Sequence, residues 1–336
     1  MPKSLIDDKG NVQVGVFPEP VDTVNYRDFA LRSPMGGRAS SLAQWLGFNQ
    51  FEFLGVLSEE IVFGVAIANV RYAGTGFAYV HEPATRRRTE RSVTRPLGLG
   101  FDFVQTPERG TSRLNTAALK VEMEGIPGGG RRLMARAKGI EIDARYTEGP
   151  MEPLRICTGA GATGWVFTRK TAGHSVEGTL VWEGKTYDLA KVGALGHHDW
   201  SAGYMRRETF WNWGCLAGRL GDGRVVGLNA SCGVNETSFL ESCFWVDGVL
   251  HRLPAVHFAY DREDFHAPWK LTDERGRIDL TFVPEGSHKE RINAGLVASN
   301  FIQIFGRYTG TLTTEAGERL QLDGLPGYSE WHYAKW

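Results

Sequence analysis

The sequence predicts an all-β protein built from short antiparallel strands, with little helix. Its apolar segments have the length and the β-branched and aromatic composition of strands, as in residues 61–70. The 42 glycines among 336 residues form no repeat and indicate many tight turns. Helical periodicity is nearly absent, and residues 39–48 are the best helix candidate. Strands that recur about every 8 to 15 residues predict antiparallel meanders, which close into barrels or pack as sandwiches.

The first half of the chain begins with a stretch of little periodicity. Prolines interrupt residues 1–35, so we expect an extended lead-in that wraps the surface of the first barrel. Composition and alternation then predict strands within residues 51–55, 61–70, 76–80, 111–124 and 140–144. Residues 165–168 and 179–182 are separated by turn-forming residues and predict a hairpin that ends at Gly184.

Asp-Gly pairs mark hairpins in the second half of the chain, because this dipeptide favours two-residue turns. The expected hairpins join residues 216–220 to 225–229 and 244–246 to 250–253, with a third turn near Asp323-Gly324. A chain of 336 residues exceeds a typical single domain. We therefore expect a lead-in at residues 1–35, a first β-barrel at 36–192 and a second at 193–336.

Composition excludes several classes of protein. A net charge of -1 and a pI of about 6.8 argue against a general binder of nucleic acid or anionic membranes. The N-terminus has no apolar signal segment, and no apolar run approaches the roughly 18 residues of a transmembrane helix. A cytoplasmic protein is expected, with transient membrane contact left open. The cysteines lack CxxC spacing and are expected to be reduced and buried: Cys157, Cys215, Cys232 and Cys243.

The stretch from Gly196 to Gly214 carries most of the reactive and aromatic side chains of the sequence. If its start is extended, alternation puts His197 and Asp199 on one face, near aromatic walls. If residues 200–204 turn and a strand comes after them, Trp211 and Trp213 share a face that could line a pocket. The alternative is a tryptophan-rich hairpin that fills a core.

Other motifs favour structural explanations. The G-x-G-x-x-G match at residues 159–164 precedes a strand-like segment, so a glycine-rich connection is favoured over a nucleotide site. The basic run at residues 85–91 is typical of a solvated hairpin. Adjacent histidines on a strand point to opposite faces, so His197 and His198 do not predict a metal site, and no cofactor is expected. No G-x-S-x-G elbow or cysteine nucleophile motif is present.

Acid-base chemistry on an apolar substrate is the activity that these residues favour. A buried Asp199 would have a raised pKa, and a protonated carboxyl group can donate a proton to an alkene. Aromatic rings such as those of Trp200, Tyr204, Trp211 and Trp213 would stabilise the resulting cation. The chain ends in aromatic residues that must be held in place, either by docking on the fold or by contributing Glu330 or His332 to the site.

Three segments resemble a calycin-like family of unknown function: residues 5–15, residues 196–203, and residues 305–310 with Glu330, His332 and Trp336. That family is similar, more distantly, to lipocalin-like carotenoid 1,2-hydratases, AttH-like proteins and fungal lipocalin-fold cyclases. The resemblance implies two packed calycin/lipocalin-like β-barrels. His198 and Trp200 fit the His-x-Trp spacing of the hydratases, with Asp199 between them, but the tyrosine and aspartate partners are not evident.

Together these observations predict a protein that binds an apolar or isoprenoid-like small molecule and hydrates, isomerises or cyclises it without a cofactor. The expected catalytic residues are His198, Asp199 and Trp200, and the expected pocket residues are His197, Tyr204, Trp211, Trp213, Glu330 and His332. A carrier or sensor that binds the same ligand without chemistry is the main alternative. A structural or interaction module with filled barrels is the third. The oligomeric state stays open.

Overall fold

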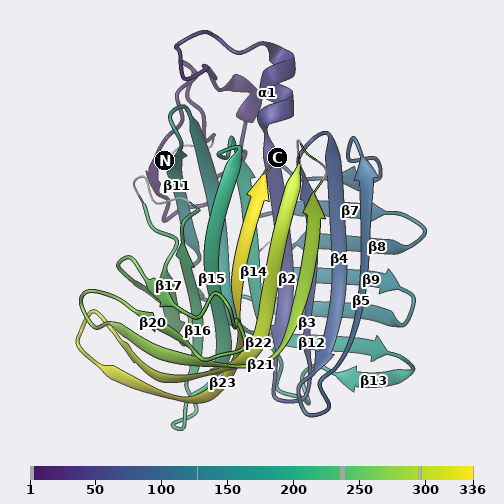
Figure 1. Cartoon of the computed structure of the whole chain (residues 1–336), viewed down its shortest axis with the longest axis vertical. Helices are drawn as coiled ribbons and strands as arrows, with labels where there is room; N and C mark the ends of the chain where they lie inside the picture. The colour runs from purple at the N-terminus through teal and green to yellow at the C-terminus, as the bar shows by residue number, and fades with distance from the viewer. Residues whose placement is uncertain (1–3, 127, 235–238, 294, 296, 336) are drawn as a thin grey trace.

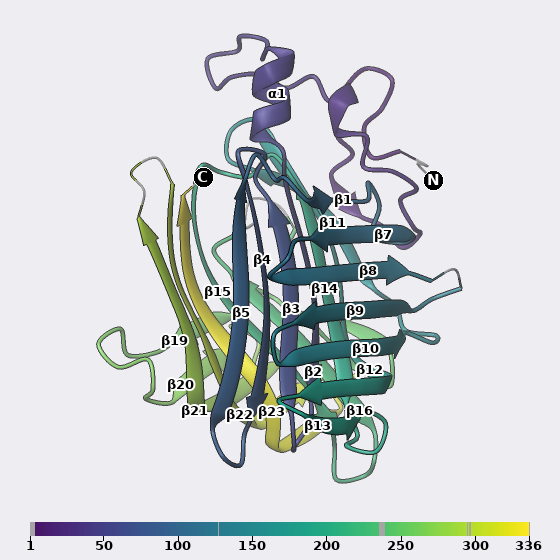
Figure 2. The same ribbon diagram turned by 90° about the vertical axis from the view of Figure 1, so that its right-hand side faces the viewer.

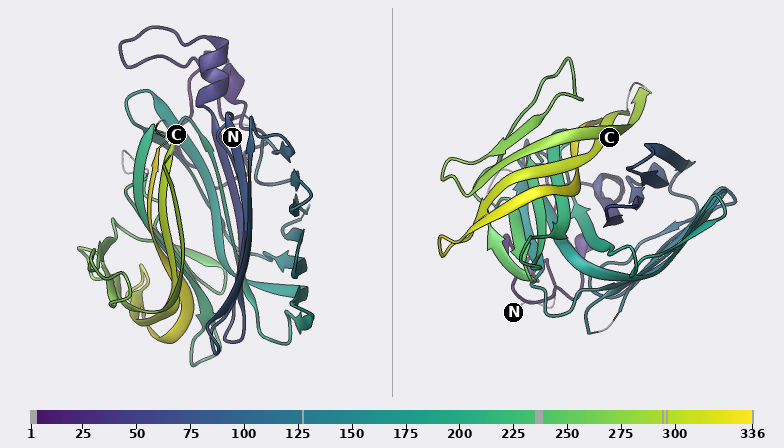
Figure 3. Two further views of the ribbon diagram at one scale, coloured as in Figure 1. Left: turned by 45° about the vertical axis from the view of Figure 1, so that its right-hand side comes forward. Right: turned by 90° about the horizontal axis from the view of Figure 1, so that it is seen from below.

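The computed structural model describes residues 4–126, 128–234, 239–293, 295 and 297–335, so Trp336 lies outside the described residues. The predicted all-β fold is confirmed: two curled antiparallel sheets pack against each other, and the described part of the chain contains a single α-helix (Figure 1). Both sheets curve into half-barrels, as the two views of Figure 3 show.

The first sheet contains fourteen strands in the order β5-β4-β3-β2-β14-β12-β10-β9-β8-β7-β6, with β11 and β13 paired to β12 and β1 paired to β11. Figure 2 shows β7 to β10 running across the direction of β2 to β5, so the sheet curls over its own core. Its strands are β1 (Gly15–Val16), β2 (Asn49–Leu57), β3 (Val62–Asn69), β4 (Ala73–Glu82), β5 (Arg87–Pro96), β6 (Phe101–Asp102), β7 (Gly110–Asn115), β8 (Leu119–Gly125), β9 (Arg131–Ala137), β10 (Ile140–Thr147), β11 (Leu154–Ala160), β12 (Gly164–Trp182), β13 (Lys185–Asp188) and β14 (Leu195–Gly203).

The second sheet contains nine strands in the order β18-β17-β16-β15-β23-β22-β21-β20-β19. The hairpins expected at the turns before residues 225 and 249 are confirmed. The strands are β15 (Glu208–Arg219), β16 (Val225–Cys232), β17 (Cys243–Val246), β18 (Val249–Arg252), β19 (His257–Ala259), β20 (Trp269–Thr272), β21 (Ile278–Asn293), β22 (Ala298–Thr313) and β23 (Arg319–Lys335).

Two expected hairpins are wrong. Residues 165–168 and 179–182 belong to one strand, β12, in which Gly173 marks a shift in the pairing with β14 rather than a reversal of the chain. Asp323-Gly324 lies inside β23 at an irregularity in its pairing with β22. Residues 159–164 comprise the end of β11, the turn at residues 161–163 and the start of β12, and no helix begins there.

The two sheets divide the chain later than the sequence suggested. The expected boundary assigned residues 193–203 to the second half. In the structure, β14 pairs with β2 and β12 and therefore belongs to the first sheet, whereas the second sheet begins with β15 at Glu208. The reactive segment is thus split, with Gly196–Gly203 in one sheet and Glu208–Gly214 in the other.

Apolar side chains form separate cores inside each curl and a third core between the sheets. The lead-in packs on β11, β12 and β14 through side chains such as Leu5, Val24 and Tyr26. The predicted helix is confirmed as α1 (Ser41–Gly47), where the Ser40 side chain accepts a hydrogen bond from the Ala43 amide at 3.2 Å. Within the described residues, no helix combines the length and the hydropathy required for a membrane span.

Candidate functional site

Strand β14 distributes the reactive residues between two sides of the first sheet. Because successive side chains of a strand alternate, His197 and Asp199 face the second sheet, whereas His198 and Trp200 face the other way. His197 and Asp199 lie on the same face of the strand, as the alternation of the sequence predicted. The three expected catalytic residues therefore do not meet in one place.

Aromatic rings from both sheets meet on the side that His197 occupies. Phe53 of β2 and Tyr79 of β4 form the first wall, and Trp213, Phe305 and Tyr328 form the facing wall. The ring centroids of Phe53 and Trp213 are 6.1 Å apart, and those of Tyr79 and Phe305 are 5.2 Å apart. We call this layer the inter-sheet site. The expected pocket residues that lie on its two faces are His197, Trp211, Trp213, Glu330 and His332.

Two glycines in the first wall make room for these rings. Gly55 of β2 lies beside His197, and a Cβ at Gly55 would overlap the imidazole ring and lie 2.9 Å from the Tyr328 hydroxyl. Gly64 of β3 lies beneath the ring of Tyr79, and a Cβ there would be 2.6 Å from it. The edges of these rings therefore occupy the space that a side chain at either glycine would need.

A histidine–tyrosine pair connects the two sheets at the inner end of the site. The Tyr328 hydroxyl is hydrogen-bonded to the imidazole of His197 and lies 3.1 Å from its Nδ1 atom and closer to Nε2, and the imidazole tautomer sets which group donates. Burial lowers the pKa of His197 well below its ordinary value, so the ring is neutral. Burial also raises the pKa of Tyr328 well above its ordinary value, so the hydroxyl keeps its proton. The pair therefore presents a neutral base hydrogen-bonded to a weak acid.

Glu330 lies two residues after Tyr328 on the same face of β23, and its carboxylate accepts hydrogen bonds from two side chains. The Trp211 indole nitrogen donates to Oε1 at 2.7 Å, and the Gln303 amide donates to Oε2 at 3.3 Å. Glu330 is buried, whereas Trp211 and His332 are only half-buried. The site therefore becomes more exposed from Tyr328 towards His332, whose Nε2 lies 3.0 Å from the Ser299 hydroxyl.

Asp199 belongs to a second buried cluster on the same face. The Lys170 ammonium lies 2.8 Å from Asp199 Oδ2 and 2.9 Å from Glu241 Oε2, so two carboxyl groups share one cation. Burial raises the pKa of Asp199, with a further contribution from Glu241 and an opposing one from Lys170. Burial alone would lower the pKa of Lys170, but the two carboxylates outweigh it and raise this pKa. Asp199 therefore lies in a buried ion pair with Lys170, next to a second carboxyl group.

His198 lies in a charged network inside the first sheet. Arg169 can only donate, so its contact of 3.3 Å makes His198 Nδ1 an acceptor, and Nε2–H then donates to Glu52 at 3.2 Å. Burial, followed by Arg131 and Arg169, lowers the pKa of His198 well below its ordinary value. Glu148 joins Arg131 and Arg169 through charged hydrogen bonds. These partners hold His198 neutral and fix its orientation.

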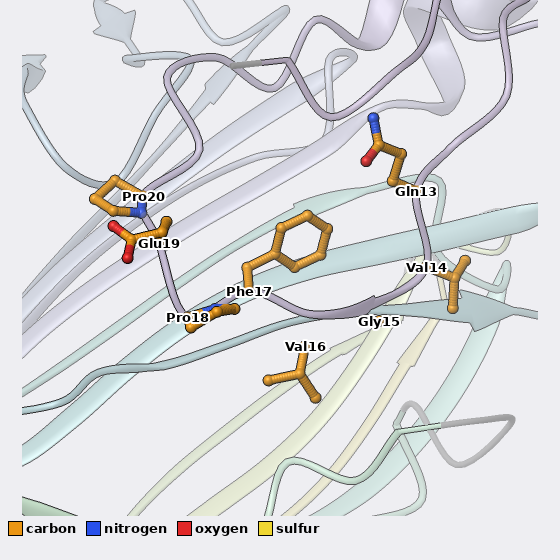
Figure 4. Close-up of a pocket in the computed structure, with 8 residues that line it drawn as sticks. All are labelled: Gln13, Val14, Gly15, Val16, Phe17, Pro18, Glu19 and Pro20. Carbon is orange, nitrogen blue, oxygen red and sulfur yellow. The ribbon is translucent and has the colours of Figure 1, made fainter. Parts of the chain in front are cut away.

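Trp200 and Tyr204 face the lead-in. The rings of Trp200 and Phe167 meet edge to face at 6.2 Å, and the Tyr204 hydroxyl donates to the Tyr26 carbonyl at 3.2 Å. Tyr204 is therefore the one expected pocket residue that lies away from the inter-sheet site. A cavity of about 180 Å³ also borders the lead-in (Figure 4). Its lining runs from Gln13 to Pro20 and includes none of the expected site residues.

Sequence reasoning missed several partners of the site. Tyr328 lies in the aromatic C-terminal run, and its alternation with Glu330 could have indicated a shared face. Lys170 gives no such signal, because its pairing with Asp199 depends on the register of β12 and β14. Among the described residues, no group of three or more His, Cys, Asp or Glu side chains has an arrangement that could hold a metal ion.

The same fold occurs in solved structures of other proteins. The structure is similar to kievitone hydratase from Nectria haematococca, with a TM-score of 0.51 and 10% identity, covering 85% of this chain and 88% of the other. It is also similar to CghA, with a TM-score of 0.50 and 10% identity, covering 98% and 96% of the two chains. At such identities the likeness shows the lipocalin-like fold alone. No curated protein matches the sequence. Residues 1–336 match the family described as a domain of unknown function (DUF2804), which confirms the predicted resemblance, and the chain belongs to that family.

Proposed function

We propose that the protein binds an apolar, isoprenoid-like small molecule between its two sheets and catalyses a proton transfer on it. The observation that carries the proposal is the meeting of Tyr328 and His197 among aromatic rings from both sheets. An apolar ligand at this position would replace ring-to-ring contacts with ring-to-ligand contacts. It would enter from the half-buried end, at Phe51, Phe77 and Trp211.

The buried groups support proton transfer in both directions. The neutral imidazole of His197 can accept a proton, and the Tyr328 hydroxyl, or the Asp199 carboxyl group when it is protonated, can donate one. Faces of Trp213 and Phe53 would stabilise positive charge on a protonated alkene, because aromatic rings carry negative charge on their faces. Such chemistry covers isomerisation, cyclisation and, where water is admitted, hydration.

A carrier function is the second candidate, and a specific observation favours it. The carboxylate oxygens of Glu330 accept from Trp211 and Gln303, and Asp199 is bonded to Lys170 and Ser201. Buried carboxyl groups whose oxygens are hydrogen-bonded by the protein need no catalytic role to explain them. The same inter-sheet site would then bind the ligand and release it unchanged.

Native mass spectrometry of freshly purified protein, followed by organic extraction, tests the proposal. We expect a stoichiometric apolar molecule, which is then the substrate for turnover assays. Tyr328→Phe and Asp199→Asn should each lower turnover by about 10²-fold or more if these groups transfer protons. Tyr204→Phe removes a buried hydroxyl outside the inter-sheet site and should leave turnover close to that of the unmodified protein.

Different outcomes separate the candidates. A bound molecule that is never converted would support the carrier. An empty protein that also takes up no hydrophobic dye would contradict ligand binding and support an interaction module. Equal loss in Tyr204→Phe and Tyr328→Phe would show that the effect arises from stability rather than from the site.

A further inference from the structure

Helix α1 projects from one end of the molecule and buries none of its residues (Figure 1). Its sequence, Ser41–Gly47, contains no charged residue. Leu42 is 64% exposed and Leu46 is 37% exposed, and their spacing places them on the same face of the helix. Met35, in the loop that leads to the helix, is 94% exposed. A helix of this kind gains little from the fold, so its apolar face has no partner within the described part of the chain.

A second apolar loop lies at the same end. Leu97 and Leu99 are 62% and 56% exposed, and the Leu97 amide donates to the Tyr72 carbonyl at 2.8 Å. The neighbouring Arg71 donates to the carbonyl of Phe48, the C-cap residue of α1, at 2.9 Å. Of the ten large apolar side chains exposed in the described part of the chain, five therefore gather at this end: Met35, Leu42, Leu46, Leu97 and Leu99.

Positive charge accompanies these apolar side chains. The only charged residues between positions 29 and 51 are Arg32 and Arg38, and both are exposed. Residues 69–76 contain Arg71 and residues 92–100 contain Arg95, and neither segment contains an acidic residue. Asp28 and Asp102 flank these segments. The net charge of the whole chain is close to zero, but the only charged residues in the apolar segments at this end are arginines.

We propose that this end of the molecule docks reversibly on an anionic phospholipid surface. The apolar face of α1 would enter the boundary between headgroups and acyl chains, and the loop at Leu97 and Leu99 would enter beside it. Arg32 and Arg38 would lie at the level of the anionic headgroups. The exposed leucines match the apolar interior of such a bilayer. The arginines beside them match its negative charge, and no carboxylate lies between them in the sequence.

The orientation also connects the docking surface with the inter-sheet site. Strand β2 begins at Asn49, directly after α1, and its half-buried ring Phe51 faces the second sheet. Figure 1 shows that β23 ends towards the same end of the molecule, where His332 is half-buried. A docked molecule would direct the more exposed end of the inter-sheet site towards the bilayer. The docking itself does not depend on the proposed chemistry.

Vesicle flotation with the full-length protein tests the proposal. We expect binding to vesicles of phosphatidylcholine mixed with phosphatidylserine, weaker binding to phosphatidylcholine alone, and a loss of the difference at high salt. Replacing Arg32 and Arg38 together with Ser should weaken binding to the mixed vesicles about 20- to 30-fold, since each arginine contributes about fivefold. The double variant Leu42→Ser with Leu46→Ser should weaken binding to both kinds of vesicle.

Matched variants keep the test specific. Val249→Ser and Val283→Ser remove apolar side chains that are 58% and 48% exposed in other strands, and they should leave flotation unchanged. Tyr328→Phe should also float normally, so that failure of the proposed chemistry and failure of docking are distinguishable. Equal binding by the α1 variants, or no binding to either vesicle, would overturn the proposal. A dimer in sedimentation velocity that dissociates in the Leu42 and Leu46 variant, without vesicle binding, would instead assign the surface to a second copy of the chain.

Discussion

Glu148 compensates two buried arginines, and its removal should be costly. Its Oε1 atom accepts from Arg169 at 3.1 Å and from Arg131 at 3.2 Å, and all three side chains are almost entirely buried. Glu148→Gln removes the carboxylate that these two guanidinium groups share and leaves them only the more distant carboxylates of Glu52 and Glu108, at 3.9 Å and 3.4 Å, in a region that excludes water. We therefore expect a loss of about 3 to 5 kcal/mol in the free energy of unfolding, measured by urea denaturation at neutral pH. Asp143→Asn breaks the exposed pair with Arg132 and should cost less than about 1 kcal/mol.

Glu148→Gln should also change how the free energy of unfolding depends on pH. Burial alone would raise the pKa of Glu148, but Arg169 and Arg131 outweigh it and hold the pKa well below the ordinary value of 4.5. The stability that this carboxylate contributes is therefore complete above pH 4.5 and is lost as the pH falls through the lowered pKa. Glu148→Gln should lose less stability than the unmodified protein over that acidic range. A variant with the same loss would show that other groups control acid unfolding.

Alternation alone predicted which residues of β14 share a face, but it could not predict what they contact. His197 and Asp199 face the second sheet as expected, because the rule needs only an extended segment. The partner of His198 lies 146 positions away at Glu52, and neither the charge nor the spacing of Glu52 indicates the pairing. Trp200 was expected in a turn, yet β14 continues to Gly203 because both neighbouring strands pair with it along that length.

At the scale of elements, the two sheets approach closely where β12 meets β16. A Cβ at Gly227 of β16 would overlap the carbonyl group of Ala172 in β12. Next to it, Gly173 has a φ of +96° and accommodates a shift in the pairing of β12 with β14. This extra residue allows Ala172 to face the second sheet and His174 to face inward.

Gly227→Ala should therefore force the two sheets apart. Backbone atoms cannot rotate away as a side chain can, so we expect a loss of about 1 to 3 kcal/mol or more in the free energy of unfolding. Gly221→Ala, in the turn before β16, is the matched control, because a Cβ there meets no atom within 4 Å. It should change stability by less than about 0.5 kcal/mol. Urea denaturation measures the free energy of unfolding of both variants. If Gly227→Ala is as stable as Gly221→Ala, the two sheets can move apart without cost.

Sequence patterns identified the strand class of most segments but not where strands end. Gly173 and Gly178 indicated a turn between residues 165–168 and 179–182, yet both glycines have positive φ angles inside the continuous strand β12. Composition cannot distinguish a glycine that reverses the chain from one that bends a strand, because both need the same backbone conformation. The hairpin at Asp247-Gly248 was predictable, since its two short strands pair with each other directly across the turn.

At the scale of the whole molecule, the sheets share one apolar layer. Phe53 of the first sheet contacts Trp213 and Tyr328 of the second, with ring centroids 6.1 Å and 6.4 Å apart. Lys170 and Glu241 form a buried ion pair across the same boundary. Separating the halves would expose this layer to water, which favours folding of the two sheets as one cooperative unit.

Phe53→Ala should consequently destabilise both sheets to the same extent. Truncating a buried phenylalanine lowers the free energy of unfolding by about 3 to 5 kcal/mol. In a cooperative molecule, protection falls by the same amount at every amide that exchanges through global unfolding. Native-state hydrogen exchange should therefore show equal losses of protection in β2 of the first sheet and in β22 of the second. If only the first sheet loses protection, the two halves unfold separately and the chain consists of two domains. Equal losses would instead mean that the inter-sheet site exists only while both sheets are folded, so ligand bound there should stabilise both sheets together.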